Sequence, residues 1–263
     1  MNLQLALRAA LEASAESRKI LKSYFGRVLS VDEKPGAGLV SEADRESERI
    51  IQSVLSRHLP EAGFLGEEAG FDKKSTTGLT WVVDPLDGTH NFVSGFPIYC
   101  SSIALVRDGE PVVGVIDAPD LGLTFHACRG QGAFLNERPI RVTNKPMKHA
   151  LLCTGFSYHQ GKTLDDQVEI FRRFMHRSLG VRRPGAAALD LAWVANGAFG
   201  GFWERGLQPW DMAAGIVLVE EAGGLTSDYK GAKLELDSDT VLVGAPHLHR
   251  EMLEIMNLAP SNQ

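Results

Sequence analysis

Two carboxylates stand three residues apart in residues 81–89, whose sequence is WVVDPLDGT. A short apolar run ends at Asp84, and a proline and a glycine then favour a tight turn through Asp87. Such a turn can direct both carboxylates and the Leu86 carbonyl toward one point, and the N–H groups from Gly88 onward can bind an anion if a helix starts there. Carboxylates beside an anion require a cation. An isolated match of this length is more often an Asx-type surface turn, so its meaning depends on the other acids of the chain.

Three further acids stand in settings that suit the same chemistry. Glu67 follows a glycine after an apolar pair, Asp44 lies in the first turn of an expected helix, and Asp211 lies near the start of an apolar helix. For Asp44 the alternative is a capping role, and for Asp211 it is an acid that interacts with the helix dipole. The residues alone leave both alternatives open. Other acids are interpreted as solvent-exposed or helix-start residues, namely Glu68, Asp72, Asp165 and Asp166.

The histidines and tryptophans suggest no competing site. His247 and His249 lie near an expected helix start without acidic partners at ligand spacing, so we expect structural or surface roles. Trp203 and Trp210 stand beside acids and could stack on a sugar ring, but apolar packing is the favoured interpretation.

Composition limits the classes of protein that the chain can belong to. Its 263 residues correspond to one large domain or two closely packed ones, and 44% hydrophobic and 23% charged residues are typical of a globular protein. The formal charge of 27 − 33 = −6 argues against a broad basic surface for nucleic acid, although a local basic patch stays open. No apolar run approaches the length of a membrane span. Three cysteines without CxxC spacing favour neither disulfides nor a zinc site and suit a reducing cytoplasm.

The elements that must position the acids change in character along the chain. Helical spacing predicts an amphipathic helix within residues 1–25, a mobile loop over residues 32–39, and a second helix that begins near Ser41 with Asp44 completing a capping box. A short strand over residues 81–83 precedes a β-rich stretch, residues 99–142, that is typical of an antiparallel sheet.

After Pro146, strands alternate with helices. Strands are expected over residues 151–154, 199–203 and 240–243, and helices over residues 164–177, 186–195, 209–221 and 248–256. We therefore expect an α+β half over residues 1–145, with most of the metal ligands, and an α/β half over residues 146–263, with Asp211 and the substrate contacts. No linker-like segment separates them, so the halves are not expected to fold independently.

Taken together, the motifs resemble the inositol monophosphatase family of lithium-sensitive, magnesium-dependent phosphatases over nearly the whole chain. The resemblance is carried by Gly66-Glu67-Glu68, by residues 84–89, and by Trp210-Asp211 followed by Gly215 and residues 221–224. Residues 40–44, 130–134, 185–190 and 202–204 support it, and the last three of these are most similar to bacterial members. The sequence departs from the family at Ser41 and His90, where many members have threonine, and neither is an expected ligand.

The resemblance implies a layered αβαβα sandwich of the inositol monophosphatase and fructose-bisphosphatase type, which mixes α+β and α/β organisation. It implies that Glu67, Asp84 and the Leu86 carbonyl bind one Mg²⁺, and that Asp84, Asp87 and Asp211 bind a second. A third, weaker Mg²⁺ stays an option. Independently of the family, four carboxylates in one cleft repel by about 4 kcal/mol per pair at roughly 4 Å and an effective dielectric of about 20, so cations are needed. Oxygen ligands suit Mg²⁺.

The resemblance also assigns roles around the metals. Glu67, Thr89 and Asp44 match the group that orients and deprotonates the attacking water. The residues matching substrate contacts are Asp87, Gly88, Thr89, Gly185, Ala187, Glu204 and Asp211. The implied reaction is hydrolysis of myo-inositol monophosphate to inositol and phosphate.

Two alternatives to that reaction stay open. One is a broader sugar-phosphate phosphatase that includes fructose 1,6-bisphosphate, and the other is a binding role in transcription complexes and ribosomal RNA synthesis, as in some bacterial relatives. The expected partners are a small phosphate monoester and a second copy of the chain, without a membrane, in the cytoplasm.

Overall fold

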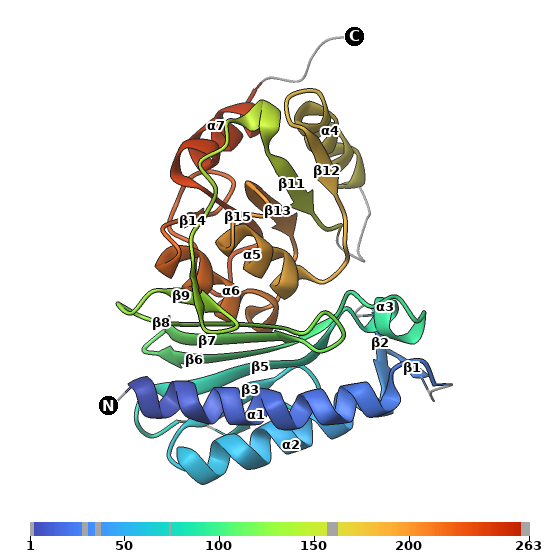
Figure 1. Cartoon of the computed structure of the whole chain (residues 1–263), viewed down its shortest axis with the longest axis vertical. Helices are drawn as coiled ribbons and strands as arrows, with labels where there is room; N and C mark the ends of the chain where they lie inside the picture. The colour runs from blue at the N-terminus through green and yellow to red at the C-terminus, as the bar shows by residue number, and fades with distance from the viewer. Residues whose placement is uncertain (1–2, 28–30, 35–37, 74, 157–162, 259–263) are drawn as a thin grey trace.

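The computed structural model describes residues 3–27, 31–34, 38–73, 75–156 and 163–258, which form five layers (Figure 1). An outer pair of helices covers an eight-stranded sheet, a second helix pair separates that sheet from a five-stranded sheet, and a third pair covers the far side. This is the expected αβαβα sandwich. The helices are α1 (Leu3–Tyr24), α2 (Glu42–His58), α3 (Thr89–Val93), α4 (Thr163–Met175), α5 (Ala187–Ala195), α6 (Pro209–Glu221) and α7 (Pro246–Met256).

The eight-stranded sheet has the order β10-β9-β8-β7-β6-β5-β3-β4 and is antiparallel except where β3 runs parallel to β5. Its strands are β3 (Gly63–Gly66), β4 (Gly70–Lys73), β5 (Leu79–Asp87), β6 (Cys100–Arg107), β7 (Glu110–Ala118), β8 (Leu123–Cys128), β9 (Ala133–Leu135) and β10 (Arg138–Ile140). The antiparallel sheet expected over residues 99–142 is confirmed. The parallel pair β3 and β5 continues the sheet beyond β6.

The five-stranded sheet has the order β12-β11-β13-β15-β14, with β11 parallel to both neighbours and the remaining pairs antiparallel. Its strands are β11 (Leu151–Thr154), β12 (Gly180–Arg182), β13 (Gly201–Arg205), β14 (Leu225–Ser227) and β15 (Thr240–Gly244). The division of the chain near Lys145 stays a prediction, and the two sheets lie on opposite sides of it in sequence.

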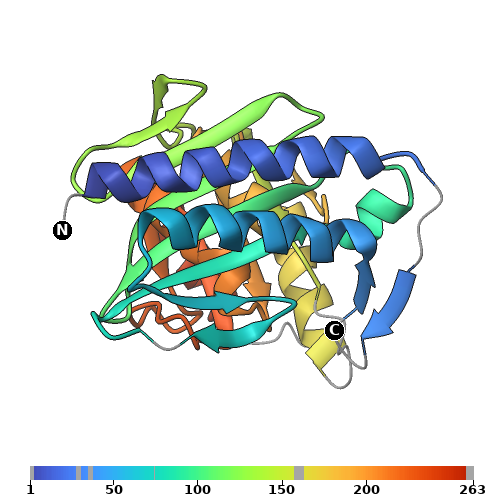
Figure 2. The ribbon, with the colours of Figure 1, turned by 90° about the horizontal axis from the view of Figure 1, so that it is seen from below.

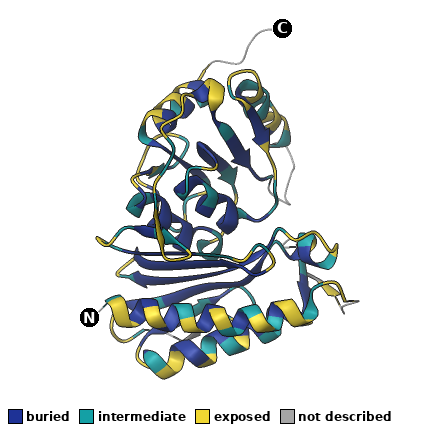
Figure 3. Cartoon of the chain, in the orientation of Figure 1, coloured by how far each residue is buried: buried dark blue, intermediate teal, exposed yellow. Residues whose placement is uncertain are grey.

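The three helix pairs differ in how they are buried. Helices α1 and α2 lie side by side across the eight-stranded sheet (Figure 2) and alternate between buried and exposed positions (Figure 3). Helices α5 and α6 are apolar on nearly all sides because each lies between the two sheets. A close approach occurs at Gly114 of β7, where an added Cβ would lie 2.6 Å from the Ala214 carbonyl of α6. A larger residue at this position would push the helix away from the sheet.

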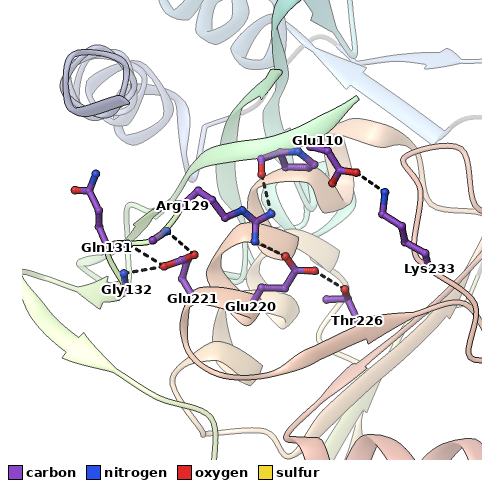
Figure 4. A network of polar contacts seen from close by, with 10 residues as sticks. Glu110, Arg129, Gln131, Gly132, Glu220, Glu221, Thr226 and Lys233 are labelled. Carbon is purple, nitrogen blue, oxygen red and sulfur yellow. Dashed lines mark hydrogen bonds and ion pairs between the residues drawn. The ribbon is translucent and has the colours of Figure 1, made fainter. Parts of the chain in front are cut away.

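The C-terminal end of α6 is fixed by a polar network (Figure 4). The carboxylate of Glu221 accepts hydrogen bonds from the N–H groups of residues 130–132, at 2.8, 3.1 and 2.8 Å. Glu220 accepts a bond from the Thr226 hydroxyl at 2.7 Å and pairs with Arg129. The helix that carries Asp211 at its other end is therefore attached to the turn between β8 and β9.

Most of the expected helix and strand boundaries after Pro146 lie within two residues of those in the structure. The capping box at Ser41 is present, with the Ser41 hydroxyl accepting from the Ala43 N–H and Asp44 accepting from the Ser41 N–H. Helix α6 begins and ends as expected, whereas the expected strand 199–203 begins two residues later as β13. Strands β12 and β14 are not among the expected strands.

The loop expected over residues 32–39 is wrong for the part of it that the structure describes. Strands β1 (Val31–Lys34) and β2 (Gly38–Ser41) pair antiparallel, with Val31 opposite Ser41. Gly38 begins β2, and residues 35–37, which include the proline and the other glycine that suggested a loop, lie outside the described residues. Among the described residues, no helix has both the length and the hydropathy of a membrane span.

Candidate functional site

Sheet register places Glu67 beside Asp84. Strands β3 and β5 pair in parallel with Gly66 opposite Val83, and the Glu67 N–H continues the ladder to the Val83 carbonyl at 3.1 Å. Both acids therefore follow the last residue pair of the ladder between β3 and β5. Their side chains are hydrogen-bonded to each other. Glu67 and Asp84 were expected together from the sequence. They lie together because β3 and β5 pair in parallel, which the sequence analysis did not predict.

The segment after Asp84 forms a tight turn that the Asp84 side chain stabilises. Oδ1 of Asp84 accepts a hydrogen bond from the Leu86 N–H at 2.9 Å, and the pairing of β5 with β6 is irregular between Asp84 and Asp87. Gly88 follows with φ +89°, and an added Cβ would lie 2.9 Å from the Ile98 carbonyl, so this position requires glycine. Helix α3 starts immediately afterwards, at Thr89, so the condition under which the sequence allows anion binding by these N–H groups is met.

Asp87 is held by the start of α5. Its carboxylate accepts hydrogen bonds from the N–H groups of Ala187 and Ala188 at 3.2 and 2.8 Å, and the Cys100 thiol lies 3.6 Å away. Two segments a hundred residues apart in sequence meet here. The N–H of Ala187, a residue that the family resemblance assigns to the substrate contacts, is directed at Asp87 in this structure.

Asp211 occupies the first turn of α6. Its Oδ2 accepts a hydrogen bond from the Gln208 N–H at 2.7 Å, and the adjacent Trp210 carbonyl accepts one from the Ser102 hydroxyl of β6 at 3.1 Å. The helix-start role that the sequence left open is therefore present. A carboxylate has about four lone-pair positions, so one backbone bond leaves others for a cation.

Asp44 and Thr89 form a second buried polar pair. The Thr89 hydroxyl lies 3.0 Å from Oδ1 of Asp44 and 3.0 Å from the Leu86 carbonyl. Asp44 is fully buried at 0% exposure, and its capping bonds to Ser41 coexist with the contact to Thr89. The capping interpretation and the functional interpretation of Asp44 are thus compatible.

Burial and mutual repulsion make the charged state of these acids costly. Desolvation, followed by the charges of Glu67, Asp87 and Asp211, raises the pKa of Asp84 well above its usual range. Desolvation raises the pKa of Asp87 to about 6, and desolvation followed by the charge of Asp87 raises the pKa of Asp211 strongly. A positive charge among these four residues would remove the repulsion.

The donor atoms of the four acids are of the type that a hard divalent cation binds. Glu67, Asp84, Asp87 and Asp211 supply only oxygen, which Mg²⁺ prefers. Within the described part of the chain, no three acidic, histidine or cysteine side chains converge closely enough to enclose a cation as they stand. Each aspartate accepts a hydrogen bond from a backbone N–H, which leaves further lone pairs of its carboxylate for a cation.

Glu204 extends the site into the C-terminal half. It lies on β13, and its carboxylate covers Gly155, where an added Cβ would collide with it. Desolvation raises the pKa of Glu204 to about 8, while the charge of Arg183 opposes the shift. The adjacent Arg205 pairs with Asp239 at 3.2 Å.

Two residues near the site were missed by the sequence analysis. The Asn91 amide of α3 donates to the Ile98 and Pro184 carbonyls at 2.7 and 2.9 Å and so connects α3 to the turn that carries Gly185. Asp190 of α5 is 1% exposed, its Oδ1 has no hydrogen-bond partner among the described residues, and desolvation followed by the charge of Glu204 raises its pKa strongly. The alanine-rich segment around Asp190 gave no indication that this acid is buried.

The histidines, the tryptophan and the cysteines described next have the packing or surface roles that the sequence predicted. His249 is buried and bonded to the Ser227 hydroxyl at 2.9 Å, and His247 contacts the Lys145 carbonyl at 2.9 Å. Trp203 is 2% exposed and packs on Phe174 with ring centroids 4.4 Å apart. Cys100, Cys128 and Cys153 are buried, with free thiols.

Comparison with known proteins agrees with this geometry. The family model described as "Inositol monophosphatase family" matches residues 2–260. An inositol-1-monophosphatase from Synechocystis sp. is 42% identical over 98% of this chain and 89% of its own length. The "Nus factor SuhB" of Pseudomonas aeruginosa is 40% identical over 98% of this chain and 99% of its own. The crystal structure of the extragenic suppressor protein suhB from Bartonella henselae superposes with a TM-score of 0.91 at 37% identity, covering 96% of this chain and 98% of that one.

Proposed function

Because the chain belongs to the inositol monophosphatase family and is a phosphatase, we propose that it hydrolyses myo-inositol monophosphate to inositol and phosphate. The observation that carries this proposal is the meeting of Glu67, Asp84, Asp87 and Asp211 at one place, with Glu204 beside them. A phosphate group would face the acids through a cation, and Glu204 would face the organic part of the substrate.

The family is metal-dependent, generally on Mg²⁺, and we propose two ions. Glu67, Asp84 and the Leu86 carbonyl would hold one, and Asp84, Asp87 and Asp211 would hold the other, with a third as an option near Asp44. Bound there, Mg²⁺ would supply the positive charge that stabilises a phosphoryl transition state and activates water. The raised pKa values of Asp84 and Asp211 support this assignment, since a cation favours their charged forms.

The chain's own groups would then orient the reactants. Thr89, already within 3.0 Å of Asp44, is suited to hold the attacking water, with Glu67 and Asp44 accepting its proton. The N–H groups of Gly88 and Thr89 would contact phosphate oxygens at the start of α3. No protein side chain becomes a covalent intermediate in this scheme.

The leaving group would lie toward α5 and β13. Glu204 would accept a hydrogen bond from a ring hydroxyl, and the backbone of Gly185 and Ala187 would bound the ring on the other side. Asp211 would also lie within reach of the substrate. For Ala187 to donate to a hydroxyl, its present 3.2 Å bond to Asp87 would have to be shared, which a cation drawing Asp87 away would permit.

A substrate panel tests this proposal directly. We expect kcat/KM with saturating Mg²⁺ to be higher for myo-inositol 1-phosphate than for fructose 1,6-bisphosphate or a simple aromatic phosphate. The names of the relatives favour inositol phosphate over the broader alternative. Equal or higher values for fructose 1,6-bisphosphate would contradict the assignment of substrate while leaving the phosphatase activity intact.

A second, non-catalytic role is supported by relatives named Nus factor SuhB. We propose that the chain associates with transcription complexes. We also propose that it is a homodimer, that Li⁺ inhibits it, and that it is located in the cytoplasm, which suits three unpaired cysteines. Capture of purified RNA polymerase by the wild-type chain and by an inactive Asp84→Asn variant separates the two roles. Capture by neither protein would contradict the association.

A further inference from the structure

A row of polar side chains is buried on the first two turns of α2. Asp44, Ser47 and Glu48 are 0%, 0% and 5% exposed, and their spacing places them on one face of the helix. The same face continues into the apolar core with Ile51 and Leu55. Buried polar groups are costly unless they are hydrogen-bonded, so the contacts of this row explain its place.

Each member of the row contacts a different segment of the candidate site. Asp44 meets the Thr89 hydroxyl at 3.0 Å, the Ser47 hydroxyl donates to the Pro85 carbonyl at 2.9 Å, and Oε1 of Glu48 accepts from the Glu68 N–H at 3.0 Å. Pro85 stands between Asp84 and Leu86, and Glu68 follows Glu67. One rigid helix therefore reaches both ligand-bearing segments and the threonine.

Helix α1 supports the middle of the row. The hydroxyls of Ser17 and Ser47 lie 2.7 Å apart, and both residues are fully buried. Since the Ser47 proton is directed at the Pro85 carbonyl, Ser17 donates to Ser47. A chain of two hydrogen bonds thus runs from α1 through α2 to the turn between the two signature aspartates.

The fit of Glu48 is shown independently by Gly66. An added Cβ at Gly66 would collide with Oε1 of Glu48 and lie 2.8 Å from the Phe64 ring. Gly66 immediately precedes Glu67, so the Glu48 carboxyl occupies the space above the backbone that leads into a proposed ligand. The glycine is required here by close approach.

We propose that Ser47 and Glu48 are positioning residues that set the distance between the Glu67 segment and the Asp84–Leu86 segment, so that both can hold one cation. The sheet alone does not do this, because the ladder between β3 and β5 ends with the bond from the Glu67 N–H to Val83. Beyond that bond, the two contacts from α2 fix the backbone on each side. This inference rests on the proposed function of the acids as Mg²⁺ ligands.

The test is the dissociation constant for Mg²⁺, measured by calorimetric titration of the whole chain without substrate. Glu48→Ala removes the acceptor and is expected to raise the constant about 10- to 100-fold, as loss of an outer contact to a metal ligand does. Glu48→Gln keeps an amide oxygen for the Glu68 N–H and is expected to stay within about 3-fold of wild type. Glu61→Ala, which removes an exposed acid just after the same helix, is the matched control and should match wild type.

Two further measurements separate positioning from simple loss of stability. The melting temperature of each variant in chelator reports folding alone, and kcat at saturating Mg²⁺ should largely recover in Glu48→Ala because the ligands themselves are present. Ser47→Ala, which removes a single hydroxyl, provides a second test and is expected to raise the Mg²⁺ constant on the order of 2- to 10-fold. If Glu48→Ala does not fold, the Mg²⁺ dissociation constant of Ser47→Ala alone tests the positioning role.

The outcomes that overturn the inference are distinct from those that overturn the proposed function. A folded Glu48→Ala or Ser47→Ala variant that binds Mg²⁺ as wild type does would show that these residues are structural only. A Glu48→Gln variant as impaired as Glu48→Ala would show that charge, not the hydrogen bond, matters, and would also contradict positioning. A wild-type chain that binds no Mg²⁺ would instead remove the proposed metal site itself.

Discussion

Glu204 is the residue whose surroundings say most about what the site accepts. Its carboxyl lies over the bare backbone of Gly155, and desolvation raises its pKa to about 8. A partly dehydrated carboxyl gains more from a hydrogen bond to a hydroxyl than a solvated one does. The residue is therefore suited to recognise a polyol. Its proposed contact with substrate predicts selectivity, its raised pKa predicts a pH dependence of stability, and the two can be measured separately.

Above about pH 8, where the Glu204 carboxyl is charged, we expect Glu204→Gln to lower kcat/KM for inositol monophosphate by roughly 10- to 150-fold, since losing a hydrogen bond to a charged group costs on the order of 1.5 to 3 kcal/mol. A small aromatic phosphate, which has no ring hydroxyls, should be hydrolysed almost as before. The two specificity constants are measured side by side. Parallel changes, or none, would remove Glu204 from the substrate contacts.

The raised pKa of Glu204 also predicts how stability depends on pH in the metal-free protein. The folded-state pKa of about 8 exceeds the ordinary value of 4.5, so the folded state retains a proton that the unfolded state releases. This contribution is fully present below pH 4.5 and is lost as the pH rises to about 8. The melting temperature in chelator should thus fall over this range, and Glu204→Gln should flatten the fall. Curves of equal slope for the two proteins would contradict the burial of a titrating Glu204.

The identities of the acids were predictable at this scale, but their surroundings were not. Asp84, Asp87, Glu67 and Asp211 stand in a recognisable order, which was enough to expect them together. Nothing local to Asp190 distinguishes a buried carboxyl from a helix-surface one, and the charge that raises its pKa beyond the effect of burial comes from Glu204, which is not its neighbour in sequence. Because Asp190 is buried, Asp190→Asn is unsuitable as a neutral control.

At the scale of elements, the site is assembled by contacts between helix starts. The start of α5 binds Asp87 through the N–H groups of Ala187 and Ala188, and Asn91 of α3 holds the turn just before α5. Capping signals identified the start of α2 in advance because they are local in sequence. The parallel pairing of β3 with β5 and the hairpin of β1 and β2 depend on distant partners or on short strands, which local patterns do not specify.

Asn91→Ala tests the connection between α3 and α5. The variant leaves the Ile98 and Pro184 carbonyls without their side-chain donor and should lower the free energy of unfolding by about 1 to 3 kcal/mol. KM for inositol monophosphate should rise roughly 3- to 10-fold because the Gly185 turn loosens, while the Mg²⁺ dissociation constant stays unchanged. Denaturant unfolding, steady-state kinetics and calorimetry measure the three quantities.

Asn257→Ala is the matched control for this variant. Its amide donates to the Leu253 carbonyl at 2.8 Å at the end of α7, far from the acids in sequence and on an outer helix. KM should not change in this variant. If KM rises equally in both variants, or if Asn91→Ala weakens Mg²⁺ binding, the account of α3 as a support for the substrate side only is wrong.

At the scale of the whole molecule, two sheets and the helices between them hold the acids in place against their mutual repulsion. Residues before the predicted division near Lys145 supply Glu67, Asp84 and Asp87, and residues after it supply Asp211 and Glu204. Helix α6 is packed between the sheets and attached at its far end by Glu221. A cation that bridges the halves should therefore stabilise the entire fold and not a single loop.

We expect Mg²⁺ to raise the melting temperature of the chain. At a hundred times its dissociation constant, a ligand that binds only the folded state adds about 2.7 kcal/mol, which corresponds to roughly 5 to 11 °C for a chain of this size. Scanning calorimetry with chelator and with Mg²⁺ measures the shift. Identical curves under the two conditions would be evidence against a metal site formed by the folded acids.

The most direct test of the central claim is phosphate release from myo-inositol monophosphate by wild type and by Asp84→Asn, each with Mg²⁺ and with chelator. Asparagine almost preserves the volume of Asp84 but removes the charge at the centre of the acid cluster. Asp237→Asn, the same change at an exposed position, is the control. We predict Mg²⁺-dependent release by wild type and the control, and release below about a thousandth of that rate by a folded Asp84→Asn protein. Release by Asp84→Asn at the wild-type rate, or release by wild type that survives the chelator, would contradict the account.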